Sequence, residues 1–122
     1  MKRTLAAVLA STLWLPALAS FAGTVSEAKL GTDIVDRQIS GETTTFSLND
    51  TAYLWMRVVD SGGEAVTVTW SNGDQSWDVS LNIGSESWRT WSSKILHLPG
   101  EWTVTISDAS GNNLHQSNLT VQ

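Results

Sequence analysis

The stretch that decides the fold is residues 66–83, which read VTVTWSNGDQSWDVSLNI. Residues 66–70 alternate strictly between apolar side chains and threonine, and residues 77–83 alternate again between apolar and polar side chains. A period of two is that of a β-strand with one buried face. Asn72 and Gly73 lie between the two runs and favour a hairpin, because both residue types tolerate positive φ. We therefore expect two antiparallel strands that bury their apolar side chains on one side, joined by a loop somewhat longer than two residues.

The rest of the chain has the same pattern of short runs rich in Val, Ile, Thr and Trp, broken by Gly, Asn, Asp and Ser. Further strands are expected at residues 28–39, 43–48, 52–59, 101–107 and 114–121. The nearly continuous apolar run at 52–59 predicts a central strand covered on both faces. In the last strand the apolar period slips between Leu114 and Leu119, which predicts a bulge or a frayed end. The pattern predicts an all-β, antiparallel immunoglobulin-like β-sandwich of about seven to eight strands, with a small β-barrel as the alternative.

The N-terminus has the three parts of a secretory signal peptide. Lys2 and Arg3 give a positive start, residues 5–18 are uncharged and mostly apolar, and small residues follow up to Ala22. The apolar run is shorter than the roughly 20 residues of a membrane span. We expect cleavage after Ala22, with Ala19 as the second choice. Residues 1–22 are then a cleaved signal peptide, and residues 23–122 form a single periplasmic or secreted domain with no membrane attachment.

Composition narrows the class of partner. The whole chain has a net charge of −5, and loss of Lys2 and Arg3 leaves five basic against twelve acidic residues, a net charge of −7. Such a domain has no basic patch for a phosphate backbone, so nucleic acid is not an expected partner. The chain contains no cysteine, so its stability has to come from packing rather than from disulfides. Six tryptophans remain after cleavage to supply that packing or a binding surface.

The segment from Trp88 to Lys94 is the one unusual local feature. Alternation along a strand places Trp88 and Ser92 on one face and Arg89 and Trp91 on the other, so both faces carry an indole beside a cation. One interpretation is a binding surface made of Trp88, Arg89, Trp91, Ser92 and Lys94, in which an indole stacks on a ligand and a cation fixes a polar group. The other is an inner strand whose indoles belong to the core or lie under Arg89. The sequence leaves both open.

No catalytic, metal-binding or cofactor-binding residues are predicted. His97 and His115 are the only histidines, and neither has a neighbour at ligand spacing. The Asp- and Asn-rich segments 74–78 and 108–112 fit no calcium-loop template and are interpreted as turns. No nucleophile elbow or singled-out carboxylate pair is present, so an enzyme is not expected; a glycan hydrolase is the catalytic alternative.

The second half of the chain resembles a known family. Residues 70–73 (WSNG), 88–94 (WRTWSSK) and 100–104 (GEWTV), followed by 108–114, are similar to DUF2914, a bacterial domain family of unassigned function. The resemblance spans roughly residues 25–121 and implies a bacterial envelope setting, and it supplies no reaction. Relatives commonly have a histidine two residues before the tryptophan that corresponds to Trp70, where this chain has Val68.

These features together predict a non-catalytic, exported binding module for another envelope component, expected to be a protein. A strand edge offers one way to recruit such a partner, by β-augmentation. The alternative is a carbohydrate-binding module that uses exposed tryptophans as a stacking platform.

Overall fold

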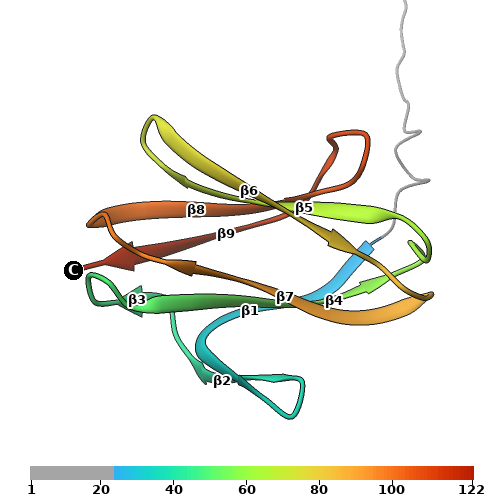
Figure 1. Ribbon diagram of the computed structural model, residues 1–122, viewed down its shortest axis with the longest axis horizontal. Coiled ribbons are helices and arrows are strands. Elements are labelled where there is room, and N and C mark those ends of the chain that lie inside the picture. Colours follow the sequence, from blue (N-terminus) through green and yellow to red (C-terminus); the bar gives the residue numbers. More distant parts are fainter. Residues whose placement is uncertain (1–23) are drawn as a thin grey trace, which may run out of the picture.

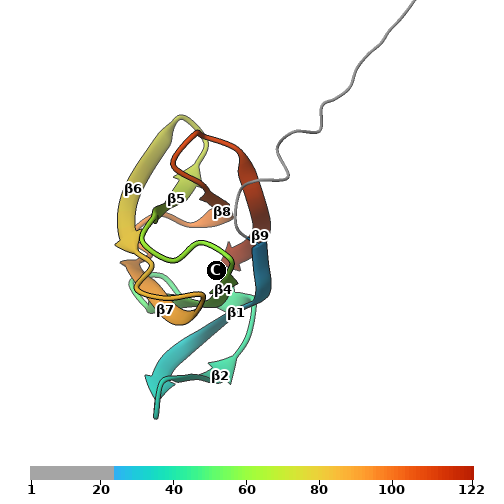
Figure 2. The ribbon, with the colours of Figure 1, turned by 90° about the vertical axis from the view of Figure 1, so that its right-hand side faces the viewer.

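A computed structural model describes residues 24–122 as two β-sheets packed face to face (Figure 1, Figure 2). The predicted signal peptide lies outside the described residues. The strands are β1 (Thr24–Val35), β2 (Gln38–Glu42), β3 (Thr45–Phe46), β4 (Thr51–Val59), β5 (Ala65–Asn72), β6 (Gln75–Asn82), β7 (Ser87–Ile95), β8 (Gly100–Ser107) and β9 (Asn113–Val121). Sheet A has the order β2-β1-β4-β7 and sheet B the order β3-β9-β8-β5-β6. The sheets do not close into a barrel, so the predicted sandwich is confirmed and the barrel alternative is wrong.

The strand order is that of an immunoglobulin-like sandwich. The sequence β1-β4-β7 in sheet A matches strands A-B-E, and β9-β8-β5-β6 in sheet B matches G-F-C with an added C′. Nine strands are present rather than seven to eight, because the run predicted as one strand at 28–39 is interrupted by a turn at Asp36 and Arg37. The strand expected at 43–48 is reduced to the two residues of β3, which pair in parallel with β9.

The hairpin that decided the fold forms as predicted, with one difference. β5 and β6 pair without a register shift, and Trp70 lies opposite Trp77. The connecting loop is shorter than expected, because pairing continues to Asn72 and Gln75 and leaves only two residues between them. The predicted bulge in the last strand is confirmed, since the register between β8 and β9 shifts at Leu114.

The core lies between the inner faces of the two sheets. The buried indoles of Trp70 and Trp102 both have acceptors: Trp70 Nε1 donates to Ser92 Oγ at 3.1 Å and Trp102 Nε1 to Leu98 O at 2.9 Å. Each indole therefore buries a large apolar surface without leaving its N–H unpaired. The residues packed around them are Leu30, Phe46, Ala52, Leu54, Met56, Val58, Val66, Val68, Ile83, Leu96, Val104, Ile106, Leu119 and Val121. Within residues 24–122 there is no helix of the length and apolarity that crossing a membrane requires.

Candidate binding surface

Strand β7 carries the five residues of the predicted binding surface and divides them between its two faces. Trp88, Ser92 and Lys94 point to the inner side of sheet A, because they alternate with residues whose partners on β4 face outward. Arg89 and Trp91 point to the outer side, opposite Arg57 and Trp55 on β4. No single surface therefore contains all five residues.

The three inward residues have structural roles. Ser92 is buried and accepts the indole hydrogen bond of Trp70. Trp88 packs against the core, and its ring lies over Gly84, where an added Cβ would come within 2.6 Å of the ring. Both side chains are thus fixed by the fold before any ligand is considered.

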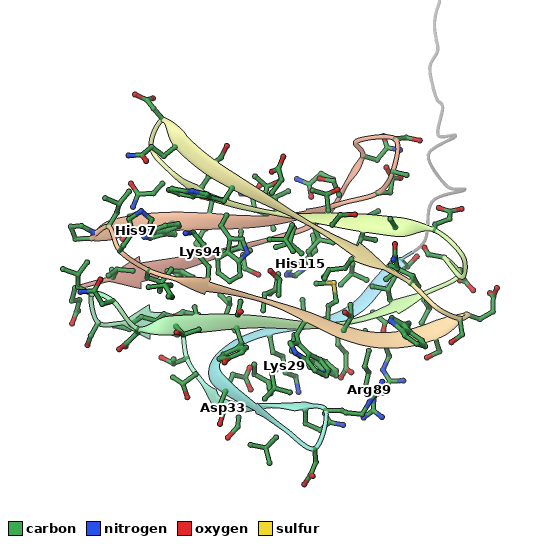
Figure 3. All side chains as sticks on the ribbon, in the orientation of Figure 1. Lys29, Asp33, Arg89, Lys94, His97 and His115 are labelled. Atoms are coloured by element: carbon green, nitrogen blue, oxygen red, sulfur yellow. The ribbon has the colours of Figure 1, made fainter. Side chains whose placement is uncertain are left out.

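Lys94 closes an aromatic stack at one end of the sandwich. Its Nζ lies 4.2 Å from the centre of the Trp77 ring, which stacks on Trp102 with ring centres 5.5 Å apart. His97 meets the edge of Trp77 at 5.2 Å. Figure 3 shows Lys94 and His97 on the side of sheet A that faces sheet B. The Lys94 ammonium group is therefore already engaged in a cation–π contact with Trp77.

The outer face of sheet A gathers aromatic and basic side chains from three strands. Cross-strand pairing places Lys29 beside Trp55, Glu27 beside Arg57, and the β4 residues beside their β7 partners. We call this surface the aromatic–basic face; it consists of Glu27 and Lys29 on β1, Tyr53, Trp55 and Arg57 on β4, and Arg89, Trp91 and Ser93 on β7. It holds three of the five basic residues that lie after residue 22.

The charges on this face are only partly paired. Arg57 Nε lies 3.6 Å from Glu27 Oε1, and Arg57 Nη1 donates to Ser87 Oγ at 3.3 Å. Arg89 lies directly opposite Arg57 and forms no ion pair with any residue of the described chain. Like charges directly opposite each other on a sheet lower its stability, so this arrangement is not explained by folding.

A hairpin covers part of the aromatic–basic face. Beyond Gly31, β1 leaves the sheet and returns as β2 beneath it, as Figure 2 shows. Trp55 Nε1 donates to Arg37 O in the hairpin turn at 2.9 Å, and the Trp55 side chain is 1% exposed. Gly31 permits the close approach, since an added Cβ would lie 2.7 Å from Ile39 Cγ1. Trp91, Tyr53 and both arginines remain half-exposed beside this cover.

The sequence interpretation missed this hairpin and with it the contribution of β1 and β4 to the surface. The available signal was the polar run Asp36, Arg37 and Gln38, which interrupts the apolar residues Val35 and Ile39. Asp36 and Arg37 adopt positive φ, 51° and 62°, which gives the two-residue turn its type I′ character without a glycine. Hairpin turns of this type usually contain Asn or Gly, so the pair gave only a weak signal.

The remaining polar residues singled out by sequence do not form a site. His97 and His115 lie apart, and His115 Nε2 is hydrogen-bonded to Ser117 Oγ. Asp108 closes a turn, as predicted: it accepts hydrogen bonds from the Asn112 side chain and from the backbone N–H groups of Asn112 and Ser110. These donors, the Asn112 side chain first, hold the pKa of the Asp108 carboxyl below its ordinary value. Among residues 24–122, no three His, Cys, Asp or Glu side chains come together as metal ligands.

One family model matches the C-terminal part of the chain. Residues 63–121 match the model of DUF2914, described as a protein of unknown function. The DUF2914 segment comprises β5 to β9, so it supplies Arg89 and Trp91 of the aromatic–basic face, while β1 and β4 precede it. Val68, the position at which the resemblance implied a histidine in many relatives, is fully buried in the core.

No curated protein matches this chain. Among solved structures it is similar to the Pseudomonas fluorescens alkylpurine DNA glycosylase AlkC bound to DNA containing an abasic site analog, with 11% sequence identity and a TM-score of 0.46. That similarity covers 79% of this chain and 30% of the glycosylase chain.

Proposed function

We propose that this chain is an exported, non-catalytic binding domain of the bacterial envelope, and that its aromatic–basic face recognises another envelope protein. The observation that carries the proposal is the concentration of half-exposed Trp91, Tyr53 and Arg89 on one outer face of the sandwich. Aromatic residues and arginine are enriched in protein interfaces, because they offer a large contact area together with planar hydrogen bonding. Ile95, at the end of β7 on the same face, adds a large apolar side chain that is 58% exposed.

The envelope setting rests on the N-terminal pattern of residues 1–22 and on the DUF2914 resemblance. Its test is the N-terminal sequence of the chain recovered from the periplasm or the medium. Export with cleavage after Ala22 yields a first residue of Gly23. Recovery of the chain in the cytoplasm with Met1 in place contradicts this part of the proposal.

The binding surface is tested by cross-linking in intact cells. A photo-crosslinking amino acid is placed at Ser93, an exposed position on the aromatic–basic face, and illuminated in bacteria that export the chain. The matched control carries it at Thr105, at the centre of the opposite outer face. We expect a covalent adduct with an envelope protein from position 93 and none from position 105. Absence of a protein adduct at 93, or the same adducts from both positions, overturns the proposal.

A carbohydrate-binding module is the second candidate, and one observation favours it. Trp91 is a partly exposed indole on the outer face of sheet A with Arg89 on the same strand, an arrangement that can stack on a sugar ring and fix its polar group. Trp55, next to it, is too deeply buried under the hairpin to extend the platform. A glycan array separates the candidates: binding that is lost on Trp91→Ala supports this one, and a silent array supports a protein partner.

A further inference from the structure

The four sheet edges of the sandwich differ in how well they can accept another strand. β2 has five residues and contains Gly41 at a φ of +64°, and β3 has two residues. β6 and β7 have eight and nine residues and pair along their whole length with a single neighbour each. Long, regular edges of this kind expose unpaired N–H and C=O groups to which an extended segment can add.

β7 has only part of the usual protection of an edge strand. It contains no proline, and its nine pairs with β4 run without a register shift. Natural edges are commonly shortened, bulged or interrupted by proline. The only protective feature of β7 is its charge, which comes from Arg89 on the outer face and Lys94 on the inner face.

The two long edges carry opposite charge. β7 has two basic residues and no acidic one, whereas β6 has Asp78 and no basic residue. Figures 1 and 2 show both strands on the same side of the sandwich, and they do not pair with each other. An acidic strand is therefore attracted to β7 and repelled by β6.

Arg89 indicates where the acidic groups lie. Its neighbour Arg57 already has Glu27 as a counter-ion, while Arg89 has none in the described chain. A strand added beside β7 places every second side chain on the aromatic–basic face, directly across from Arg89 and Trp91. A carboxylate at that position gives Arg89 a counter-ion, as Glu27 does for Arg57 on the other side of the arginine pair.

We propose that β7 is the docking edge for an extended, acidic segment of a partner protein, which adds to sheet A as a further strand with a carboxylate opposite Arg89. The proposal rests on the proposed function and specifies how the partner binds. The outward side chains of the added strand are acidic. Its inward side chains are apolar, because they continue the inner face of sheet A beyond Trp88, which packs against the core.

The experiment uses synthetic peptides as the probe and the purified chain as the receptor. An eight-residue peptide of alternating glutamate and valine is compared with the lysine–valine peptide of the same length. A third peptide keeps the glutamate–valine sequence but is N-methylated at its four central residues, which removes backbone donors while keeping charge and side chains. The dissociation constants and the hydrogen exchange of the β6 and β7 backbone amides are measured with each peptide.

The glutamate–valine peptide is expected to bind and to slow exchange at those β7 amides that have no partner on β4. The lysine–valine and N-methylated peptides are expected not to bind. Arg89→Ser weakens binding by about two- to fivefold, the size of one exposed ion pair. Arg37→Gly is the matched control, because it removes one positive charge from the exposed hairpin turn and leaves β7 intact.

Four results overturn the proposal: equal binding of the acidic and basic peptides, undiminished binding of the N-methylated peptide, protection at β6 instead of β7, and an equal loss with Arg37→Gly and Arg89→Ser. Protection of β7 that rises with protein concentration in the absence of peptide also overturns it, since a second copy then occupies the edge. Any of these results combined with a protein adduct at position 93 leaves the proposed function standing and removes only the strand-addition mode.

Discussion

The two outer faces of the sandwich are built on the same backbone pattern and differ in every other respect. The outer face of sheet B consists of polar and acidic side chains. They are Thr67, Thr69, Ser71, Ser76, Asp78, Ser80, Glu101, Thr103, Thr105, Gln116, Asn118 and Thr120. That list contains no aromatic and no basic residue, whereas the outer face of sheet A has three of each. A β-sandwich needs only one apolar face per sheet to form its core. The second aromatic surface on sheet A packs against the hairpin, and the proposed function assigns its remaining residues to a partner.

The largest expected effect comes from Trp55, which links the aromatic–basic face to the hairpin. Trp55→Ala removes a side chain that is 1% exposed and its hydrogen bond to Arg37 O. We expect the free energy of unfolding to fall by about 3–5 kcal/mol, the usual cost of truncating a buried indole. Thr105→Ala at the centre of the opposite face is the matched control and changes stability by no more than about 0.5 kcal/mol.

Urea titrations of the two variants measure this contrast. A cost below about 1 kcal/mol for Trp55→Ala contradicts the packing of the hairpin against sheet A, because an indole that is exposed in solution loses little on truncation. Trp55→Phe sharpens the result, since it keeps most of the volume and removes the indole donor.

The two sheets also differ in how their hairpins turn. The β1–β2 turn uses Asp36 and Arg37 at positive φ, and the β5–β6 turn uses Gly73 at +58°. Arg37→Gly relieves left-handed strain of about 1–2 kcal/mol and adds chain entropy worth about 0.5–1 kcal/mol, so we expect stability to rise by up to about 1 kcal/mol. Gly73→Ala meets nothing within 4 Å and incurs only the backbone strain, a loss of about 1 kcal/mol.

Thermal unfolding of both variants measures whether Arg37→Gly raises the stability and Gly73→Ala lowers it. If Arg37→Gly destabilises the chain, the Arg37 side chain contributes packing or charge that outweighs its strain. If the two substitutions change stability by the same amount and in the same direction, the two hairpin turns do not differ in backbone strain.

The architecture was predictable because its signals are local. The alternation at 66–70 and 77–83 fixes the faces of β5 and β6, and the apolar run at 52–59 correctly identifies β4 as a central strand. Its predicted cover on both faces is confirmed only in part, because on the outer face Trp55 is buried while Tyr53 and Arg57 are partly exposed. The aromatic–basic face was only half predictable, because Arg89 and Trp91 share a strand while their neighbours come from β1 and β4. Register between strands distant in sequence is set by packing, which alternation alone does not encode. The grouping of Lys94 with Arg89 has another cause, since alternation within β7 alone places their side chains on opposite faces.

The β8–β9 turn of sheet B contains a carboxylate whose contribution to stability depends on pH. Hydrogen bonds from Asn112 and its neighbours lower the pKa of Asp108 in the folded chain, so the folded state binds its proton less readily than the unfolded state. The stabilisation is present above the unfolded pKa of about 3.9 and is lost as the pH falls through the lowered folded value. Asp108→Asn is therefore expected to be less stable than the parent at pH 7, with the gap closing in strong acid.

Chemical unfolding at a series of pH values measures this gap. Asp74→Asn is the control, because Asp74 is exposed in the β5–β6 turn and its side chain forms no hydrogen bond with residues 24–122. A gap between Asp108→Asn and the parent that stays constant from neutral to acid pH contradicts the role of the carboxylate charge.

The smallest expected change in stability is the one that separates folding from binding on the aromatic–basic face. Arg89→Ser removes the like-charge pair with Arg57, so the free energy of unfolding is expected to stay level or to rise by about 0.2–1 kcal/mol. A residue retained for folding costs stability when it is removed, and a residue retained for a ligand does not. Equilibrium unfolding therefore tests whether this outer face differs from that of sheet B because of a partner: a loss of more than about 1 kcal/mol with Arg89→Ser shows that the arginine belongs to the scaffold.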